Sequence, residues 1–315
     1  MLKRVVASLS VSAAIALMAG SAVAAWPEKP IKFVIPYSTG GGFDTYVRAI
    51  APEMEKILGV QVVPENIPGA GGQKGAATVY RADPDGYTIG ILNVPGLTVP
   101  PMLGKKVSYN LDDMTWIGNL ATSTYSIAVK ADSPINSLKD LCSLGRPAKF
   151  SDTGPTSTSS VTSQISMSLI NCPITNVTGY KGSSGATVAV MRGEVDATLK
   201  PISSLRKYVK SGDLKFIVTY EAKPSIKGVP SSRELGHNEF EKLTLYRIVG
   251  APPGLPKEIA DKLSDALFQA ANSPAIQEWS KKSRKPLDPI GGAESARIMK
   301  DLSDFYAKYK SILAK

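Results

Sequence analysis

Residues 31–58 read IKFVIPYSTGGGFDTYVRAIAPEMEKIL, and this stretch decides the fold. The mainly apolar run 31–35 predicts a buried strand, and the apolar spacing over 43–58 predicts a helix. Three glycines at 40–42 lie between them, where the chain must turn. Their backbone can adopt conformations that other residues avoid. A strand, a glycine-rich loop and a helix, in this order, indicate a parallel α/β sheet with right-handed crossovers.

The same order recurs along the chain. A strand at 60–63 leads through the loop 68–72 into a helix that ends near residue 82, and a turn at 85–86 precedes a strand at 87–92. From residue 138 onward the pattern starts again, and this second set predicts its own sheet. Its strands are expected at 148–151, 174–178, 197–199 and 214–219, and its helices at 138–142, 159–170, 182–192 and 205–210.

Two extended stretches, 116–130 and 243–250, predict crossover strands between the two sets. Only helices are expected after them, at 258–271, 274–283 and 293–312. We therefore predict an α/β protein of two lobes, each a mixed, mostly parallel sheet flanked by helices. Lobe 1 is expected to comprise residues 25–120 and 246–315, and lobe 2 residues 121–245. Two crossings form a hinge, and the cleft between the lobes is the natural place for a ligand.

The first 24 residues have the layout of a secretory signal peptide that is cleaved after Ala24. Lys3 and Arg4 precede an uncharged apolar run over 5–19, and small residues follow at 22–24. The run is short for a membrane span, so we expect a soluble, exported protein. Cleavage removes two positive charges and lowers the formal net charge from +10 to +8. The basic residues form no stripe interleaved with aromatics, so no nucleic acid partner is expected.

The cysteines and the histidine restrict the chemistry. Cys142 and Cys172 are too few for a disulfide scaffold and wrongly spaced for zinc. In an exported protein they form either one disulfide or two buried thiols. His237 is the only histidine, which removes most hydrolase constellations and most histidine-based metal sites. We expect no enzyme, because no nucleophile with a neighbouring base can be assembled. We also expect no cofactor and no metal.

Four loops lead from a strand into the N-terminus of a helix, where free backbone amides can bind an anion. Two are rich in glycine, at 37–44 and 69–72. They lack the spacing of a phosphate loop, and Lys74 stands where a dinucleotide fingerprint needs its third glycine. The third loop, 152–160, carries six hydroxyl residues that can donate to a carboxylate, and the fourth is 180–184. Lys200 either makes a charge-assisted contact or is solvated.

Several motifs together resemble the Bug family, the periplasmic substrate-binding components of tripartite tricarboxylate transporters. The resemblance runs from Trp26 to the C-terminal helix. The motifs are Trp26-Pro27-x-Lys29-Pro30-Ile31, Gly41-Gly42-Phe43-Asp44 with Arg48, Glu65-Asn66-x-Pro68-Gly69-Ala70-Gly71-Gly72, Pro84-Asp85-Gly86-Tyr87-Thr88 and Tyr180-Lys181-Gly182-Ser183-Ser184. The combination of these motifs is specific to the family that they resemble.

The resemblance implies a two-lobed periplasmic binding protein, of the type II-like or Venus flytrap kind, that closes on a carboxylate. In the family, second-lobe amides and hydroxyls grip one carboxylate, and the glycine loops of the first lobe reach the ligand partly through water. One departure concerns Ser160, where many members carry a histidine. The candidate ligand-binding residues are Tyr37, Ser38, Thr39, Gly41, Gly42, Phe43, Asp44, Gly69, Ala70, Gly71, Gly72, Gly154, Thr156, Ser157, Thr158, Ser159, Ser160, Lys181, Gly182, Ser183 and Lys200.

The expected function is capture of a small organic carboxylate by a monomer that delivers it to the membrane permease. Tyr37, Phe43 and Tyr46 are placed to stack on a ring, so an aromatic carboxylate and an aliphatic di- or tricarboxylate both remain open. Two other functions are compatible with the same residues. One is a ligand sensor that engages a receptor, and the other is an exported enzyme acting on carboxylates, for which an acid–base pair is missing.

Overall fold

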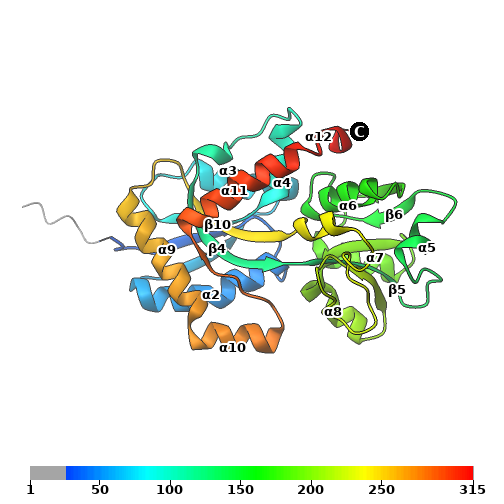
Figure 1. Ribbon diagram of the computed structural model, residues 1–315. Coiled ribbons are helices and arrows are strands. Elements are labelled where there is room, and N and C mark those ends of the chain that lie inside the picture. Colours follow the sequence, from blue (N-terminus) through cyan, green and yellow to red (C-terminus); the bar gives the residue numbers. More distant parts are fainter. Residues whose placement is uncertain (1–25, 315) are drawn as a thin grey trace, which may run out of the picture.

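The computed structural model describes residues 26–314, which form two lobes, each built on one β-sheet (Figure 1). Within these residues the first sheet has six strands in the order β11-β4-β10-β3-β1-β2, and the second has five in the order β7-β6-β8-β5-β9. The predicted signal peptide, 1–24, lies outside the described residues. Over 26–314, every helix is too short or too polar to cross a membrane. No group of three potential metal-ligating His, Cys, Asp or Glu side chains occurs in the same residues.

The first sheet is mixed. β1 pairs in parallel with β2 and β3, whereas β10 is antiparallel to both β3 and β4, and β11 is antiparallel to β4. The strands β1 to β4 therefore run in one direction, and β10 and β11 run in the other. The strands are β1 (Ile31–Ile35), β2 (Val62–Asn66), β3 (Thr88–Asn93), β4 (Thr115–Ser123), β10 (Leu245–Ala251) and β11 (Ile290–Gly291).

Helices flank this sheet. α2 presents an apolar face that buries Tyr46, Val47, Ile50 and Met54, and it ends at Gly59, whose left-handed backbone closes the last turn. α9 and α11 pack against β4, and α2 packs against α9 (Figure 1). The helices are α2 (Gly42–Leu58), η1 (Ala70–Gly72), α3 (Gln73–Tyr80), α4 (Val94–Met102), η2 (Leu111–Asp113), α9 (Lys257–Asn272), α10 (Pro274–Ser283) and α11 (Gly292–Ala307).

The second sheet is also mixed, because β6 is parallel to β7 and β8 while β5 is antiparallel to β8 and β9. A disulfide joins Cys142 to Cys172, with 4.9 Å between their Cα atoms, and ties α5 to the loop before β7. The elements are β5 (Tyr125–Lys130), α5 (Leu138–Cys142), β6 (Ala148–Ser151), α6 (Thr158–Leu169), β7 (Ile174–Val177), α7 (Gly182–Met191), β8 (Ala197–Pro201), α8 (Ile202–Lys210), β9 (Leu214–Thr219) and η3 (Asn238–Lys242).

The chain passes between the lobes twice, in both of the stretches expected to cross. The first stretch is two strands in different sheets, with Thr124 between β4 and β5. The second follows η3 and becomes β10, which belongs to the first sheet. The C-terminal helix expected over 293–312 is divided into α11 and α12 (Lys310–Leu313), and α12 contacts α6 of the second lobe (Figure 1).

The helix α4 was not predicted. Its sequence VPGLTVPPM contains prolines near both ends, which suggest a loop, yet one proline occupies the first turn, where no amide donor is needed. Every residue from Val94 to Pro100 is buried, so the segment has no polar face and no helical periodicity for a sequence pattern to detect. Packing against α6 and β10 holds it in place.

Candidate ligand-binding site

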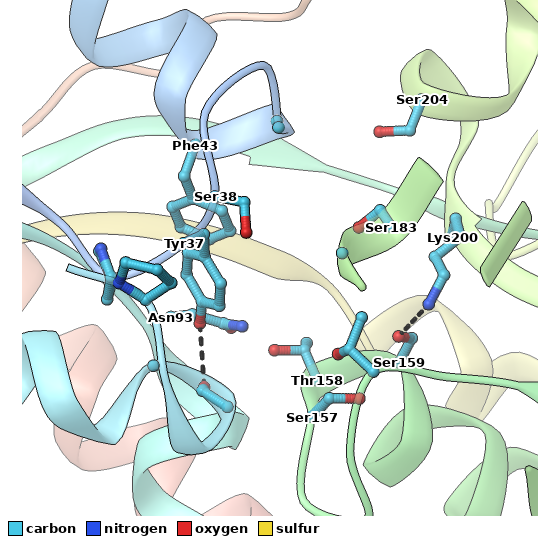
Figure 2. Close-up of a pocket in the computed structure, with 18 of the residues that line it drawn as sticks. Tyr37, Ser38, Phe43, Asn93, Ser157, Thr158, Ser159, Ser183, Lys200 and Ser204 are labelled. Carbon is cyan, nitrogen blue, oxygen red and sulfur yellow. Dashed lines mark hydrogen bonds between the residues drawn. The ribbon is translucent and has the colours of Figure 1, made fainter. Parts of the chain in front are cut away.

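A cavity of about 500 Å³ lies between the two lobes. Figure 2 shows residues of the first lobe facing those of the second across it. This volume suits a small organic ligand. The lining residues are Pro36, Tyr37, Ser38, Thr39, Gly40, Gly41, Gly42, Phe43, Pro68, Gly69, Ala70, Gly71, Gly72, Asn93, Tyr125, Thr153, Ser157, Thr158, Ser159, Tyr180, Lys181, Gly182, Ser183, Ser184, Lys200, Pro201, Ser204, Leu245 and Arg247.

The buried carboxylate of Asp44 orders the first glycine loop. Its Oδ2 accepts a 2.9 Å hydrogen bond from the Gly40 amide, and its Oδ1 accepts from Arg48 Nε and Asn66 Nδ2, each at 2.9 Å. Burial alone would raise the pKa of this carboxyl, but the three donors outweigh it and hold the pKa below its ordinary value. Asp44 therefore shapes the cavity without lining it.

Tyr37 connects the two glycine loops. Its hydroxyl donates to the Gly71 carbonyl over 3.3 Å, and its ring lies 4.6 Å from that of Phe43, between centroids (Figure 2). Gly72 has a φ of 102°, and a Cβ there would lie 2.7 Å from the Tyr37 hydroxyl, so only glycine fits this position. Burial raises the pKa of the Tyr37 phenol, which keeps it a donor. The tyrosine thus forms an aromatic wall on the first lobe.

The third loop opens α6 with a network centred on Asp152. Ser157 caps the helix by accepting from the Ser160 amide at 3.3 Å, and both Ser157 and Ser159 donate to Asp152 Oδ1, the latter over 2.9 Å. Lys200 Nζ lies 2.7 Å from Ser159 Oγ and 3.4 Å from Asp152 Oδ1 (Figure 2). Its side chain is 3% exposed, so this lysine is part of a buried ion pair and not solvated.

The fourth loop brings a second helix N-terminus to the cavity. α7 begins at Gly182, whose φ of 69° favours glycine, and no side chain of residues 26–314 caps it. Lys181, Ser183 and Ser184 line the cavity beside this end. The N-termini of α6 and α7 thus border one space, and the partial positive charge of each favours an anion there.

Seventeen of the predicted residues line the cavity, and four do not: Asp44, Gly154, Thr156 and Ser160. Ser160 is fully buried and accepts from Asn176 and Gln164 within lobe 2. Thr156 lies at the contact between the lobes, 3.9 Å from where a Cβ on Gly71 would be. Asp44 and Ser160 are bonded within their own lobes, and ligand contact remains a prediction for all twenty-one positions.

Several lining residues were not predicted, most importantly Arg247, Asn93, Tyr125 and Ser204. Arg247 stands in the middle of β10, whose other residues are mainly apolar, and an arginine in a buried strand is a signal that the sequence does contain. Asn93 is likewise a polar residue directly after the apolar run of β3. Tyr125 and Ser204 carry no comparable signal.

Comparisons with known proteins identify the group to which this architecture belongs. Residues 46–315 match the family described as tripartite tricarboxylate transporter family receptor, TctC. The chain belongs to this family. It is 30% identical over 260 residues to a UPF0065 protein in the gbd 5′ region of Cupriavidus necator, which covers 80% of this chain and 78% of the relative.

Two solved structures share the fold of this chain. The periplasmic binding protein BugD has a TM-score of 0.82 at 25% identity and covers 92% of this chain and 99% of its own. MatC from Rhodopseudomonas palustris with bound malate has a TM-score of 0.80 at 23% identity and covers 91% and 100%. The Bug resemblance, the two-lobed α/β fold and a solute-binding rather than enzymatic role are thereby confirmed.

Proposed function

We propose that this TctC receptor captures a small organic carboxylate between its lobes in the periplasm and delivers it to the permease of a tripartite tricarboxylate transporter. One observation carries the proposal. All three charged side chains that line the cavity are cations, Lys181, Lys200 and Arg247; Asp152 balances only Lys200, and within residues 26–314 no carboxylate lines the cavity. Two helix N-termini add to the positive field, so an anionic ligand is favoured over a neutral one.

The neutral groups in the wall support the same ligand. Buried polar atoms without a partner in the described part of the chain include Asn93 Oδ1 and Thr158 Oγ1, both from lining residues. An unpaired buried polar group costs about 1–3 kcal/mol, so a ligand or water that satisfies it stabilises the complex. The malate bound to the related MatC is a carboxylate of suitable size.

Closure of the lobes would couple binding to delivery. Residues of both lobes line the cavity, so the ligand binds the closed form more tightly than the open one and shifts the equilibrium toward it. We place the hinge where the chain leaves one sheet for the other, at Thr124 between β4 and β5 and at 243–244 before β10; the predicted boundaries, 120–121 and 245–246, fall within β4 and at the start of β10. Small-angle scattering of the mature monomer should give a smaller radius of gyration with ligand than without it; identical curves would refute closure.

A thermal-shift screen tests the ligand class. The mature protein is heated with aliphatic and aromatic mono-, di- and tricarboxylates, and each acid is paired with its uncharged amide as the control. Ligand binding to the native state raises the melting temperature by mass action. We expect shifts with acids of one chemical class and none with the amides. Shifts with sugars or neutral amides, and none with any acid, would contradict carboxylate capture.

A further inference from the structure

The proposed function uses the positive charge of Arg247 but assigns its guanidinium no contact with the ligand. This residue lies in β10, lines the cavity and is 1% exposed. Its Nη1 donates to Ser123 Oγ over 2.8 Å, and its Nε has no partner within residues 26–314. The guanidinium carbon lies 4.5 Å from the centre of the Tyr46 ring and 5.4 Å from that of Phe43. Aromatic rings thus hold the side chain in place and leave most of its donors unused.

The charge of Arg247 has no ion-pair partner among residues 26–314. Burial lowers the pKa of Arg247, and the groups that oppose this shift are the phenols of Tyr46 and Tyr125, not a carboxylate. Other cations lie close by instead. The pKa of Lys285 is lowered by burial and by the positive charges of Arg247 and Lys207. Lys285 Nζ also lies 6.0 Å from the centre of the Tyr46 ring that Arg247 faces, so two cations share this ring.

The second buried cation of the cavity, Lys200, differs from Arg247 because it has a counterion. Lys200 has Asp152 as its counterion, both side chains being 3% exposed, and its ammonium is also bonded to Ser159. Burying a charge without a partner is costly, and a partner with good hydrogen-bond geometry offsets the cost. Lobe 2 supplies that partner for its lysine, whereas lobe 1 supplies none for its arginine. A ligand can supply it.

We propose that Arg247 is a specificity-determining residue that binds a second acidic group of the ligand directly, while the N-terminus of α6 and its hydroxyls hold the first. This inference rests on the proposed function, since it assigns the second contact of the same carboxylate. A guanidinium is planar and can bind both oxygens of a carboxylate. The N-terminus of α6 binds the first carboxylate of the ligand, so the second is free to bind Arg247. The site therefore selects diacids over monoacids of equal length.

Calorimetric titration of the mature protein with diacids and their half-amides tests this. The pairs are adipate with its monoamide and terephthalate with terephthalamate, and hexanoate and benzoate serve as monoacids. We expect the wild type to prefer the diacid that fits over its half-amide by about 30-fold or more, the range of a desolvated charge pair. R247M should lower diacid affinity to that of the half-amide and change half-amide affinity by less than about threefold. R192M, on an exposed arginine directly after α7, is the control.

Each result has one meaning. Equal affinity of diacid and half-amide in the wild type, or equal loss of both in R247M, would overturn the inference and leave Arg247 a structural cation. Binding of monoacids only would also overturn it, while the proposed function would stand. Binding of no acid would contradict the proposed function itself. If circular dichroism shows that R247M does not fold, R247K is used instead. The point charge of its lysine should lower the affinity for the diacid and leave the affinity for the half-amide unchanged.

Discussion

The buried pair of Lys200 and Asp152 predicts a large and measurable loss of stability when one partner is removed. Both side chains are 3% exposed and lie 3.4 Å apart. Removing one member of such a pair typically costs 3–5 kcal/mol, because the other charge stays buried without compensation. In Lys200→Met the carboxylate keeps its donors Ser157 and Ser159, so we expect the lower end, about 3 kcal/mol.

A double-mutant cycle separates this interaction from the effects of packing. The variants are K200M, D152N and K200M/D152N, and urea unfolding is followed by circular dichroism at pH 7. The double variant should lose less stability than the sum of the single variants, with a coupling free energy of about 2 kcal/mol. K130M, which removes an exposed pair with Asp132, is the matched control in the same lobe and should leave the urea midpoint unchanged. A coupling near zero, or an equal effect of K130M, would refute the reasoning.

Three further predictions concern the loops and the second lobe. Gly75→Ala places a Cβ 2.6 Å from the proline after β1 and should cost about 1–3 kcal/mol in urea unfolding, while Gly154→Ala, which meets open space, should cost almost nothing. Replacing both Cys142 and Cys172 by alanine opens a loop of sequence separation 30 and should cost about 3–4 kcal/mol, also in urea, without changing the ligand class. The lowered pKa of Asp44 predicts stability that is present above about pH 4 and lost as pH falls through the folded-state pKa.

Each of these has a result that would contradict it. Equal tolerance of alanine at Gly75 and Gly154 would mean that the loop after β1 can move away from α3. An unchanged urea midpoint in the cysteine variant would mean that the disulfide does not restrain the unfolded chain. Thermal melts between pH 3 and pH 7 should show a steeper acid decline for the wild type than for D44N; parallel curves would show that the Asp44 carboxylate is not selectively stabilised in the fold.

Much of the fold was predictable because strands and helices alternate with clear periods. The run 31–35 and the helix that follows it satisfy local rules that no distant contact overrides. The element α4 was not predictable in the same way, because a helix buried on all sides shows no apolar stripe. The break at Thr124 was also hidden, since β-branched and aromatic residues continue on both sides of it and only the pairing partners differ.

The residues of the cavity also fall into those that the sequence predicts and those that it does not. Glycine and hydroxyl residues at strand-to-helix junctions could be predicted to lie there, because loop position follows from the order of elements. Arg247 depends on the register of β10 between β3 and β4, which brings its side chain over the rings of α2. Whether Lys200 is paired or solvated depends on Asp152, which lies 48 residues away in sequence. Such contacts arise from tertiary packing, and no local pattern contains them.

A crystal structure of the mature protein with the acid that gives the largest thermal shift tests the central claim most directly. We expect the ligand between the lobes, with one carboxylate at Ser157–Ser159 and the remainder against Tyr37 and the glycine loops. Density for the acid elsewhere on the protein, or in this cavity with its carboxylate turned toward solvent, would contradict carboxylate capture between the lobes.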